Sequence, residues 1–280
     1  MNQLPLKGFL IDIDGVLRVG AAALPGAAET IAWLRRQRAP FRLLTNVTQK
    51  SRAEEAARLA GMGISVAPNE VFTASAVAAE YLRRQGARRC LVLLEGTALE
   101  DFHGIEVSAR DPEYVVLGDL GDDFPASLLH GAFRALLAGA RLIAIQRNRA
   151  WTGNDGLARL DVGAWVSALE YSSGQQATVM GKPASFAYQL PAADLGLPLE
   201  QLGMVADDPD VDLSGARQAG LQTIFVRTTS LPQRRPVAVG EFDYALDSVA
   251  ELPHLVPWAG PATSCTTPIA HLSTQREESV

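Results

Sequence analysis

The sequence predicts an α/β protein whose core is a doubly wound, Rossmann-like parallel sheet. Short apolar runs bounded by turn residues recur along the chain, and segments with helical spacing lie between several of them. Strands that alternate with helices favour parallel pairing in layered α/β structures. Polar residues directly follow several of the runs, and open sheets of this kind bind ligands beyond the carboxyl ends of their strands. We therefore expect a functional site at that edge of the sheet.

Most of the apolar runs have the length and composition of buried strands. In chain order they are GFLIDID (8–14), FRLLTN (41–46), EVFTAS (70–75), CLVLLE (90–95), YVVLG (114–118), RLIAIQ (141–146), ATVMGK (177–182), LGMVADD (202–208) and TIFVRT (223–228). Helices are predicted between several of these runs. SRAEEAARLAG opens with Ser51 and Glu54 in capping-box positions, and YLRRQG ends on Gly86, a typical residue after a helix C-terminus.

Composition argues against several classes of protein. The 280 residues are 48% hydrophobic, which is enough for one large or two modest domains, and their net charge is -6. No dense block of Lys and Arg is found, so we expect no nucleic-acid partner. No apolar run approaches the roughly 20 residues of a membrane span, and we expect no export or anchoring signal. Cys90 and Cys265 show no metal or redox spacing, which favours a reducing compartment and predicts a cytoplasmic location.

The polar residues at the ends of the predicted strands form an ordered set. An acid pair comes first, then a hydroxyl with an amide, then a lysine, and finally a group of acids. They are Asp12 and Asp14, Thr45 and Asn46, Lys182, and Asp207 with Asp208 and Asp212. Each alone has a local explanation, because Asp, Asn and Thr also favour turns and helix caps. Together, in this order, they match what phosphoryl transfer through a carboxylate nucleophile requires.

The crowded carboxylates of this set predict a metal site. Like charges at one sheet edge repel one another, and a divalent cation relieves that repulsion. All-oxygen ligands suit Mg²⁺, which accepts one or two carboxylates together with phosphate oxygens. Asp12 could then attack phosphorus, while Asp14 could protonate the leaving oxygen and later activate water. The hydroxyl, amide and lysine would bind the phosphate, and the helix beginning near Ser51 could point its N-terminal dipole toward the same anion.

The segments DIDGVL, TN, GKP and ADDPDVD resemble, in order, the four motifs of the haloacid dehalogenase superfamily. The likeness is to the phosphatases with a large type-2 cap, the class that includes nitrophenylphosphatase-like enzymes. The resemblance implies that Asp12 is the nucleophile and Asp14 the acid and base. It implies that Mg²⁺ is held by the Asp12 carboxylate, the Asp14 backbone carbonyl and Asp207. Asp208 or Asp212 would support the metal site without binding the ion directly.

The same resemblance assigns phosphate binding to Thr45, Asn46 and Lys182. Two positions depart from the usual family pattern. Ala206 stands where the family usually has glycine before the acids of the fourth motif, so the backbone near the metal would be tighter. Val47 stands where many relatives carry a polar residue, which removes a side-chain donor but leaves a backbone N–H for the phosphate.

About a hundred residues between EVFTAS and ATVMGK carry strands and helices of their own, which is the size of a domain. We predict a discontinuous core and an inserted α/β type-2 cap that closes over the active site and reads the leaving group. The last residues lose periodicity and gain Ser, Thr and Pro, which predicts a disordered tail. The predicted divisions are core 1–75 and 178–258, cap 76–177, and tail 259–280.

The segments TNVTQKSR, LDVGAWVSALEY and VMGKP resemble a narrower branch, the phospholysine phosphohistidine inorganic pyrophosphate phosphatases and their close relatives. Similarity to related enzymes implies a homodimer formed through the cap. Residues that could read the leaving group are Arg149, Trp151 and Asn154 in RNRAWTGNDG, although an ordinary surface loop is the favoured interpretation of that segment.

The sequence thus predicts an Mg²⁺-dependent phosphatase that acts on a small phosphorylated molecule through an aspartyl-phosphate. A phospho-accepting signalling receiver also combines acids, a threonine and a lysine, but it has no need of a hundred-residue insertion or of Asp14. A nucleotide-binding module is disfavoured because GxxxxGK[ST] is absent and no GxGxxG follows a strand. A catalytically inactive scaffold of the same family is disfavoured because all the expected catalytic positions are filled. The sequence does not identify the physiological substrate.

Overall fold

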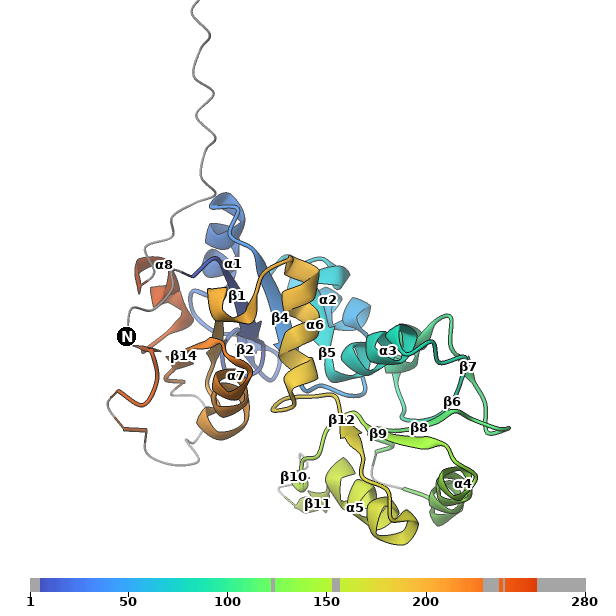
Figure 1. Cartoon of the computed structure of the whole chain (residues 1–280). Helices are drawn as coiled ribbons and strands as arrows, with labels where there is room; N and C mark the ends of the chain where they lie inside the picture. The colour runs from blue at the N-terminus through green and yellow to red at the C-terminus, as the bar shows by residue number, and fades with distance from the viewer. Residues whose placement is uncertain (1–5, 122–123, 153–156, 229–236, 239, 256–280) are drawn as a thin grey trace, which may run out of the picture.

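The computed structural model describes residues 6–121, 124–152, 157–228, 237–238 and 240–255. Within them the chain forms two parallel sheets, one of six strands and one of five, with helices packed against both (Figure 1). The predicted fold class, an α/β protein with a doubly wound parallel core, is confirmed.

The six-stranded sheet has the order β15-β14-β13-β1-β4-β5, and its pairings are all parallel. Its strands are β1 (Gly8–Asp12), β4 (Phe41–Thr45), β5 (Val71–Thr73), β13 (Leu202–Ala206), β14 (Gln222–Val226) and β15 (Tyr244–Leu246). The chain runs outward from β1 through β4 to β5, and the later strands are added on the other side of β1. The topological switch point therefore lies at β1 and β13, where sheets of this type bind ligands.

Helices cover both faces of this sheet. Successive side chains of a strand point to opposite faces, so Phe9 and Ile11 pack in one apolar cluster with α1, α2 and α8, whereas Leu10 packs in another with α3, α6 and α7. All five residues of β1 are buried as a result. The helices are α1 (Ala27–Arg36), α2 (Arg52–Gly61), α3 (Ala74–Arg84), α6 (Ser185–Leu195), α7 (Ser214–Ala219) and α8 (Leu252–Leu255).

The five-stranded sheet has the order β12-β9-β8-β6-β7 and is also parallel. Its strands are β6 (Arg89–Leu93), β7 (Glu106–Val107), β8 (Tyr114–Leu117), β9 (Arg141–Ala144) and β12 (Thr178–Val179). The helices α4 (Ala126–Leu137) and α5 (Val162–Ser173) pack on one face, the lower one in Figure 1. The other face, which includes Val92, Val116 and Ile143, belongs to the same apolar cluster as α3.

Short elements complete the described structure. Two antiparallel ribbons pair β2 (Arg18–Val19) with β3 (Ala22–Ala23), and β10 (Ala150–Thr152) with β11 (Ala158–Leu160). A π-helical turn spans Pro209–Leu213 directly after β13. Short 3₁₀ segments span Pro68–Glu70, Thr97–Phe102, Leu199–Gln201 and Val249–Glu251.

Each apolar run predicted as a strand contains one, and the helix predicted after Ser51 begins there. The Ser51 Oγ accepts a hydrogen bond from the Glu54 N–H at 3.2 Å, which is the expected cap. The other half of the predicted capping box is wrong, because the Ser51 N–H donates to Thr97 Oγ1 at 3.0 Å and the Glu54 carboxylate pairs with Lys50. Gly86 follows α3 with φ +70°, as a residue at that position should.

The carboxyl edges of the two sheets face each other. Gln49, in the loop after β4, accepts a backbone hydrogen bond from Ala98 at 3.2 Å, and its side-chain amide donates to Glu95 Oε1 at 3.0 Å. Glu95 follows the carboxyl end of β6. Because all strands of a parallel sheet end at the same edge, these contacts bring the ligand-binding edge of one sheet against that of the other.

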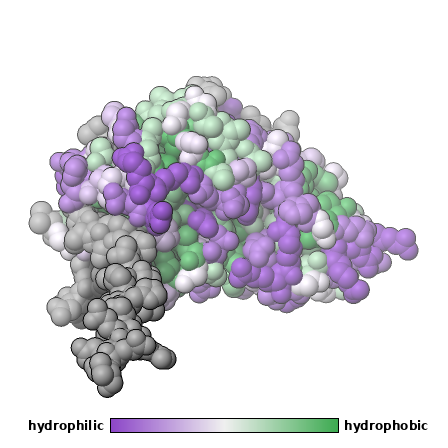
Figure 2. Space-filling model, turned by 90° about the horizontal axis from the view of Figure 1, so that it is seen from above, coloured by the Kyte–Doolittle hydropathy of each residue, from purple (hydrophilic) through white to green (hydrophobic). Residues whose placement is uncertain are grey.

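The face of the molecule seen in Figure 2 carries hydrophilic residues (purple) over much of its area, with apolar residues (green) between them. Within the described ranges, no helix is both long and apolar enough to cross a bilayer. The predicted tail, 259–280, lies outside the described residues, as does Cys265.

Candidate active site

Lys182 lies between two carboxylates at the carboxyl edge of the six-stranded sheet. Its Nζ donates to Asp12 Oδ1 and to Asp212 Oδ2, each at 2.7 Å. Asp12 is the last residue of β1, Asp212 lies in the turn after β13, and Lys182 comes shortly after β12. All three side chains are buried, so residues separated by 170 and 30 positions in the sequence meet in one ion-pair triad.

The triad holds more negative than positive charge. Burial lowers the pKa of Lys182, but the carboxylates of Asp12 and Asp212 outweigh that effect and raise the pKa above its usual value. Burial raises the pKa of Asp12 well above its usual value; Lys182 opposes this rise, whereas Asp212 and Asp207 add to it. One ammonium group therefore faces three carboxylates in a poorly solvated place.

Asp207 is the third of these carboxylates and directly follows β13. A Cβ on Gly15 would collide with the Asp207 carboxylate, so the glycine, at φ +85°, lets the loop after β1 approach this acid closely. Burial, together with repulsion from Asp212, raises the pKa of Asp207 to about 6. In the described part of the chain Asp207 forms no salt bridge, in contrast to Asp12 and Asp212.

Asp14 is held by an arginine that the sequence analysis missed. Arg18 donates from Nε to Asp14 Oδ1 at 2.9 Å and from Nη2 to Oδ2 at 3.3 Å. The Arg18 side chain is only 2% exposed, and its Nη1 lies 2.7 Å from Oε1 of Glu55, which is fully buried on α2. Asp14 itself is 48% exposed, so it is the acid of the pair that can reach solvent and a leaving group. The spacing of four residues between Asp14 and Arg18 was the available signal.

Thr45 and Asn46 lie at the end of β4, next to the triad. Thr45 is buried, and its Oγ1 accepts a hydrogen bond from the Val47 N–H at 3.2 Å, so its hydroxyl hydrogen stays available as a donor. The expectation that the Val47 N–H is free for phosphate is wrong, because that group is bound to Thr45. Asn46 donates from Nδ2 to the Lys182 carbonyl at 2.9 Å and accepts the Lys182 N–H at 2.8 Å. Asn46 therefore fixes the backbone that carries the lysine, and one Nδ2 hydrogen remains.

The two acids predicted to support the metal site have different surroundings. Asp212 contacts Lys182, as described above. Asp208 caps the turn after β13, because its Oδ1 accepts the N–H groups of Asp210 at 2.9 Å and Val211 at 2.8 Å. The Tyr188 hydroxyl donates to the Asp212 carbonyl at 2.8 Å and secures the same turn from α6.

Three N–H groups at the start of α2 are bound to other residues of this chain, whereas the sequence predicted that this end of the helix points toward the anion. The Arg52 N–H donates to Oδ2 of the buried Asp101 at 3.2 Å, and the N–H groups of Ser51 and Glu54 are bound as described above. The positive end of the helix thus faces a carboxylate of this chain that comes from the turn after β6.

The oxygen ligands available at this site suit Mg²⁺ better than a metal ion held by protein side chains alone. Among the described residues, no three His, Cys, Asp or Glu side chains form a group that could hold an ion alone. Mg²⁺ does not need such a group, because it keeps several waters and takes one or two carboxylates plus substrate oxygens. Asp12 and Asp207 provide two carboxylates, and burial, with a smaller contribution from repulsion between the neighbouring acids, raises the pKa of both.

Comparison with known proteins identifies the family. Residues 9–108 match the family model described as haloacid dehalogenase-like hydrolase, and residues 179–252 match a second, HAD-hydrolase-like model. The chain is 39% identical over 223 residues to haloacid dehalogenase-like hydrolase domain-containing protein 2 of Bos taurus, covering 80% of this chain and 85% of that protein. This chain belongs to the haloacid dehalogenase-like hydrolase family. The family predicted from the four motifs is thereby confirmed.

Named phosphatases are also similar to this hydrolase. It is 34% identical over 229 residues to the phospholysine phosphohistidine inorganic pyrophosphate phosphatase of Homo sapiens, covering 80% of this chain and 83% of that protein. Among solved structures, NagD of E. coli K-12 gives a TM-score of 0.78 at 27% identity, covering 89% of this chain and 98% of that one. The p-nitrophenyl phosphatase of Archaeoglobus fulgidus gives 0.80 at 25% identity, covering 90% and 99%.

The structure describes only part of the segment predicted to read the leaving group. Arg149 is exposed in the loop between β9 and β10. For Trp151, in β10, the structure describes the backbone but not the side chain. Asn154 lies outside the described residues.

Proposed function

We propose that this hydrolase is an Mg²⁺-dependent phosphatase that hydrolyses a small phosphorylated substrate through an aspartyl-phosphate on Asp12. The observation that carries the proposal is the buried triad of Asp12, Lys182 and Asp212, with Asp207 beside it. A carboxylate held at a strand end, a neighbouring lysine and an excess of acids are the parts that this chemistry needs. The phosphatases among the relatives support the same reaction class.

Asp12 and Lys182 act on the phosphoryl group. An Asp12 carboxylate oxygen attacks phosphorus, the new O–P bond forms, and the bond from phosphorus to the leaving oxygen breaks. Lys182 is already within hydrogen-bond distance of Asp12, so its charge lies where negative charge builds up on the phosphoryl oxygens. The Thr45 hydroxyl and the remaining Asn46 N–H are the neutral donors at the same strand edge. They would orient those oxygens.

Asp14 carries the proton. It gives a proton to the leaving oxygen as the bond to phosphorus breaks, and it then takes a proton from the water that attacks the aspartyl-phosphate. Inorganic phosphate leaves and the Asp12 carboxylate is restored. Arg18 holds Asp14 through two hydrogen bonds and thereby fixes the direction in which this acid faces.

Asp12, Asp207 and the backbone carbonyl of Asp14 would hold the magnesium ion. When bound, Mg²⁺ neutralises the crowded carboxylates and withdraws charge from the phosphoryl oxygens. The part of the chain that forms the five-stranded sheet would act as the cap; the predicted range 76–177 contains four of its strands, and β12 (Thr178–Val179) lies just beyond that range. The contact between the carboxyl edge of that sheet and Gln49 supports this role as a cap. Gln49 lies in the loop after Thr45 and Asn46, the residues that would bind the phosphate.

Hydrolysis of 4-nitrophenyl phosphate tests the proposed function. The purified protein should release 4-nitrophenol with Mg²⁺, and an excess of EDTA should abolish the release, with recovery when Mg²⁺ is restored. Without metal, Asp207 binds a proton below about pH 6. The proton competes with the metal, so the Mg²⁺ concentration for half activation should rise by up to about tenfold per pH unit below pH 6 and change little above pH 7. Full activity in EDTA would contradict the proposal.

The exchange Asp14→Asn tests the proton carrier. The amide cannot supply a proton, so turnover should fall most for alkyl phosphates, whose leaving oxygens need protonation, and least for 4-nitrophenyl phosphate. The measurement is kcat/KM across a series of leaving groups of increasing pKa, which should show a steeper dependence in the variant. An equal loss for good and poor leaving groups would count against Asp14 as the acid.

A further inference from the structure

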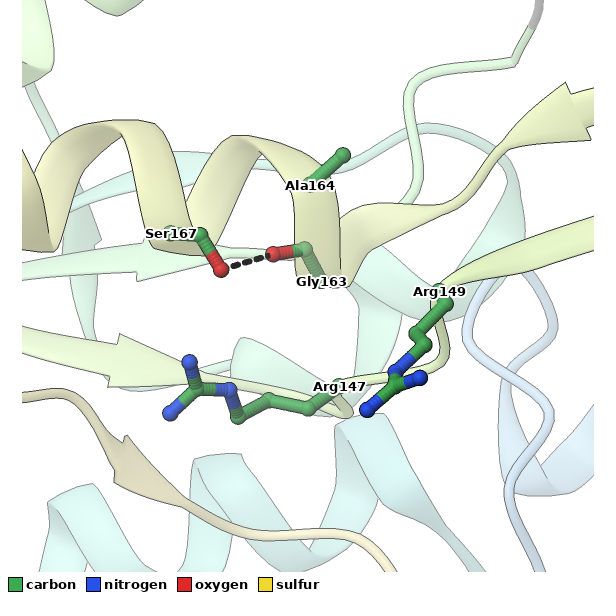
Figure 3. A pocket seen from close by; sticks show the side chains of 5 residues that line it. All are labelled: Arg147, Arg149, Gly163, Ala164 and Ser167. Carbon is green, nitrogen blue, oxygen red and sulfur yellow. Dashed lines mark hydrogen bonds between the residues drawn. The ribbon is translucent and has the colours of Figure 1, made fainter.

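A cavity of about 490 Å³ lies beside the five-stranded sheet. It is lined by Arg147, Arg149, Gly163, Ala164 and Ser167 (Figure 3). Its walls are the loop between β9 and β10 and the first turns of α5. A volume of this size is typical of sites for small molecules, which span roughly 300–1,000 Å³.

The two arginines of the cavity are not equivalent. Arg147 forms a fork with Glu170 on α5, with Nη2 to Oε2 at 2.7 Å and Nη1 to Oε1 at 3.2 Å. The Arg149 guanidinium is exposed and has no hydrogen bond or ion pair with any residue that the structure describes. Figure 3 shows both side chains leaving the same stretch of chain beneath α5. Among the described residues, the charge of Arg147 is therefore paired with Glu170, whereas the charge of Arg149 is available to a ligand.

The start of α5 forms part of the cavity wall, but the hydrogen-bond donors of Gly163 and Ser167 there are already bound within the chain. The Gly163 N–H donates to the Asn148 carbonyl at 3.0 Å, and the Ser167 hydroxyl donates to the Gly163 carbonyl at 2.8 Å. A Cβ at Gly163 would lie 2.5 Å from the Asn148 carbonyl oxygen and 2.6 Å from that of Arg147, so only glycine lets the loop approach the helix this closely. The positive charge of the cavity thus comes from its arginines.

The cavity begins two residues after Ile145, which lies beside residues proposed to bind the phosphate. A Cβ at Gly181 would lie 2.8 Å from both the Ile145 carbonyl oxygen and Asn46 Oδ1, so the end of β9 lies against Asn46. Gly181 also donates its N–H to Ile145 at 2.7 Å and directly precedes Lys182. Arg147 follows Ile145 by two residues, a Cα separation of at most about 8 Å. The loop that carries the two arginines therefore starts beside the residues that we propose hold the phosphate.

We infer that this cavity binds an anionic group, a carboxylate or a second phosphate, on the leaving part of the substrate, with Arg149 as the principal contact. The inference rests on the proposed phosphatase function and narrows its substrate class to small phosphate esters or anhydrides that carry a second negative charge. A guanidinium group binds both anions through paired N–H donors. Arg149 gives the cavity a positive charge in a chain whose net charge is -6.

Matched substrates test this inference. Alkyl phosphates of increasing chain length are compared with the same molecules carrying a terminal carboxylate or a terminal phosphate, and 4-nitrophenyl phosphate reports on the reaction itself. At one or more chain lengths, kcat/KM for a charged molecule should exceed that for its neutral counterpart at least about tenfold, the effect of one charge-assisted contact. The preference should shrink as the salt concentration rises. The carboxylate and phosphate series show which anion is bound.

Two variants connect the preference to the cavity. Arg149→Ala should reduce the ratio of charged to neutral kcat/KM about tenfold, and Ala164→Glu should do the same by placing a carboxylate in the cavity. Arg134→Ala removes one positive charge from an exposed position on α4, outside the cavity, and should leave the ratio unchanged. Circular dichroism and the unfolding temperature show whether each variant is folded.

The outcomes separate the two levels of the proposal. Failure to hydrolyse 4-nitrophenyl phosphate with Mg²⁺ would overturn the proposed function and this inference with it. Hydrolysis without a preference for charged leaving groups, or an equal loss for charged and neutral substrates in Arg149→Ala, would overturn the inference alone.

Discussion

Asp12→Asn should lower kcat for 4-nitrophenyl phosphate by at least about a thousandfold, because the amide cannot form the covalent bond to phosphorus. The fold should survive, since the exchange conserves size and removes one of three crowded carboxylates. We expect the unfolding temperature to stay the same or to rise. Steady-state kinetics with Mg²⁺ and thermal unfolding followed by circular dichroism provide the two measurements.

Asp194→Asn is a matched control for this exchange. Asp194 lies near the end of α6, its side chain is 46% exposed, and it pairs with Arg42 on the surface. The same chemical change there should leave both activity and stability nearly unaltered. Substantial activity in Asp12→Asn would refute the assignment of the nucleophile, and unfolding of the variant would show that Asp12 is needed for the structure.

Glu55→Leu should lower the free energy of unfolding by about 3–5 kcal/mol, because Arg18 Nη1 would remain buried without its carboxylate. The Glu55 side chain has no exposed surface and Arg18 has 2%, so water cannot replace the lost contact. Urea unfolding at constant pH measures the loss. Asp14 pairs with Arg18, and Arg58 pairs with Glu55. Both of these outer side chains are partly exposed and should contribute little to the loss of stability.

A double exchange separates the ion pair from general packing. Adding Arg18→Met to Glu55→Leu removes the buried guanidinium, which Asp14 alone would otherwise pair, and an apolar pair of similar volume should recover most of the stability. Glu80→Gln is the surface control, because Glu80 on α3 pairs with Arg83 and Arg84 in a solvated place and should cost less than about 1 kcal/mol. A loss below that value in Glu55→Leu would show that the buried pair is not a major source of stability.

The sequence was sufficient for the strands and for the acids and lysine at their ends. Asp12 and Asp212 follow β1 and β13 of one parallel sheet, and strands of such a sheet end at a common edge, so these two acids meet although they lie far apart in the chain. Lys182 follows β12 of the other sheet, and it reaches this edge because the carboxyl edges of the two sheets face each other, which the pattern of apolar runs does not show. The roles of these residues stay predictions until the variants are measured.

The sequence was not sufficient for contacts set by the packing of one element on another. Glu55 looks like a surface acid on an amphipathic helix, and only the position of α2 against the loop after β1 buries it beside Arg18. The first turn of α2 was predicted to face the phosphate, but the turn after β6 places Asp101 and Thr97 there instead. Neither arrangement has a local sequence signal.

Gly181 has a consequence for how enzymes of this type diversify. Lys182, which we propose meets the phosphoryl group, directly follows this glycine. The loop from Arg147 to Arg149, which we propose meets the rest of the substrate, begins two residues after Ile145, whose carbonyl contacts Gly181. Exchanges in the loop can change which molecules are accepted while the lysine stays in place. Selectivity and chemistry are thus open to separate mutation, and an engineer could vary residues 147–149 without rebuilding the catalytic residues.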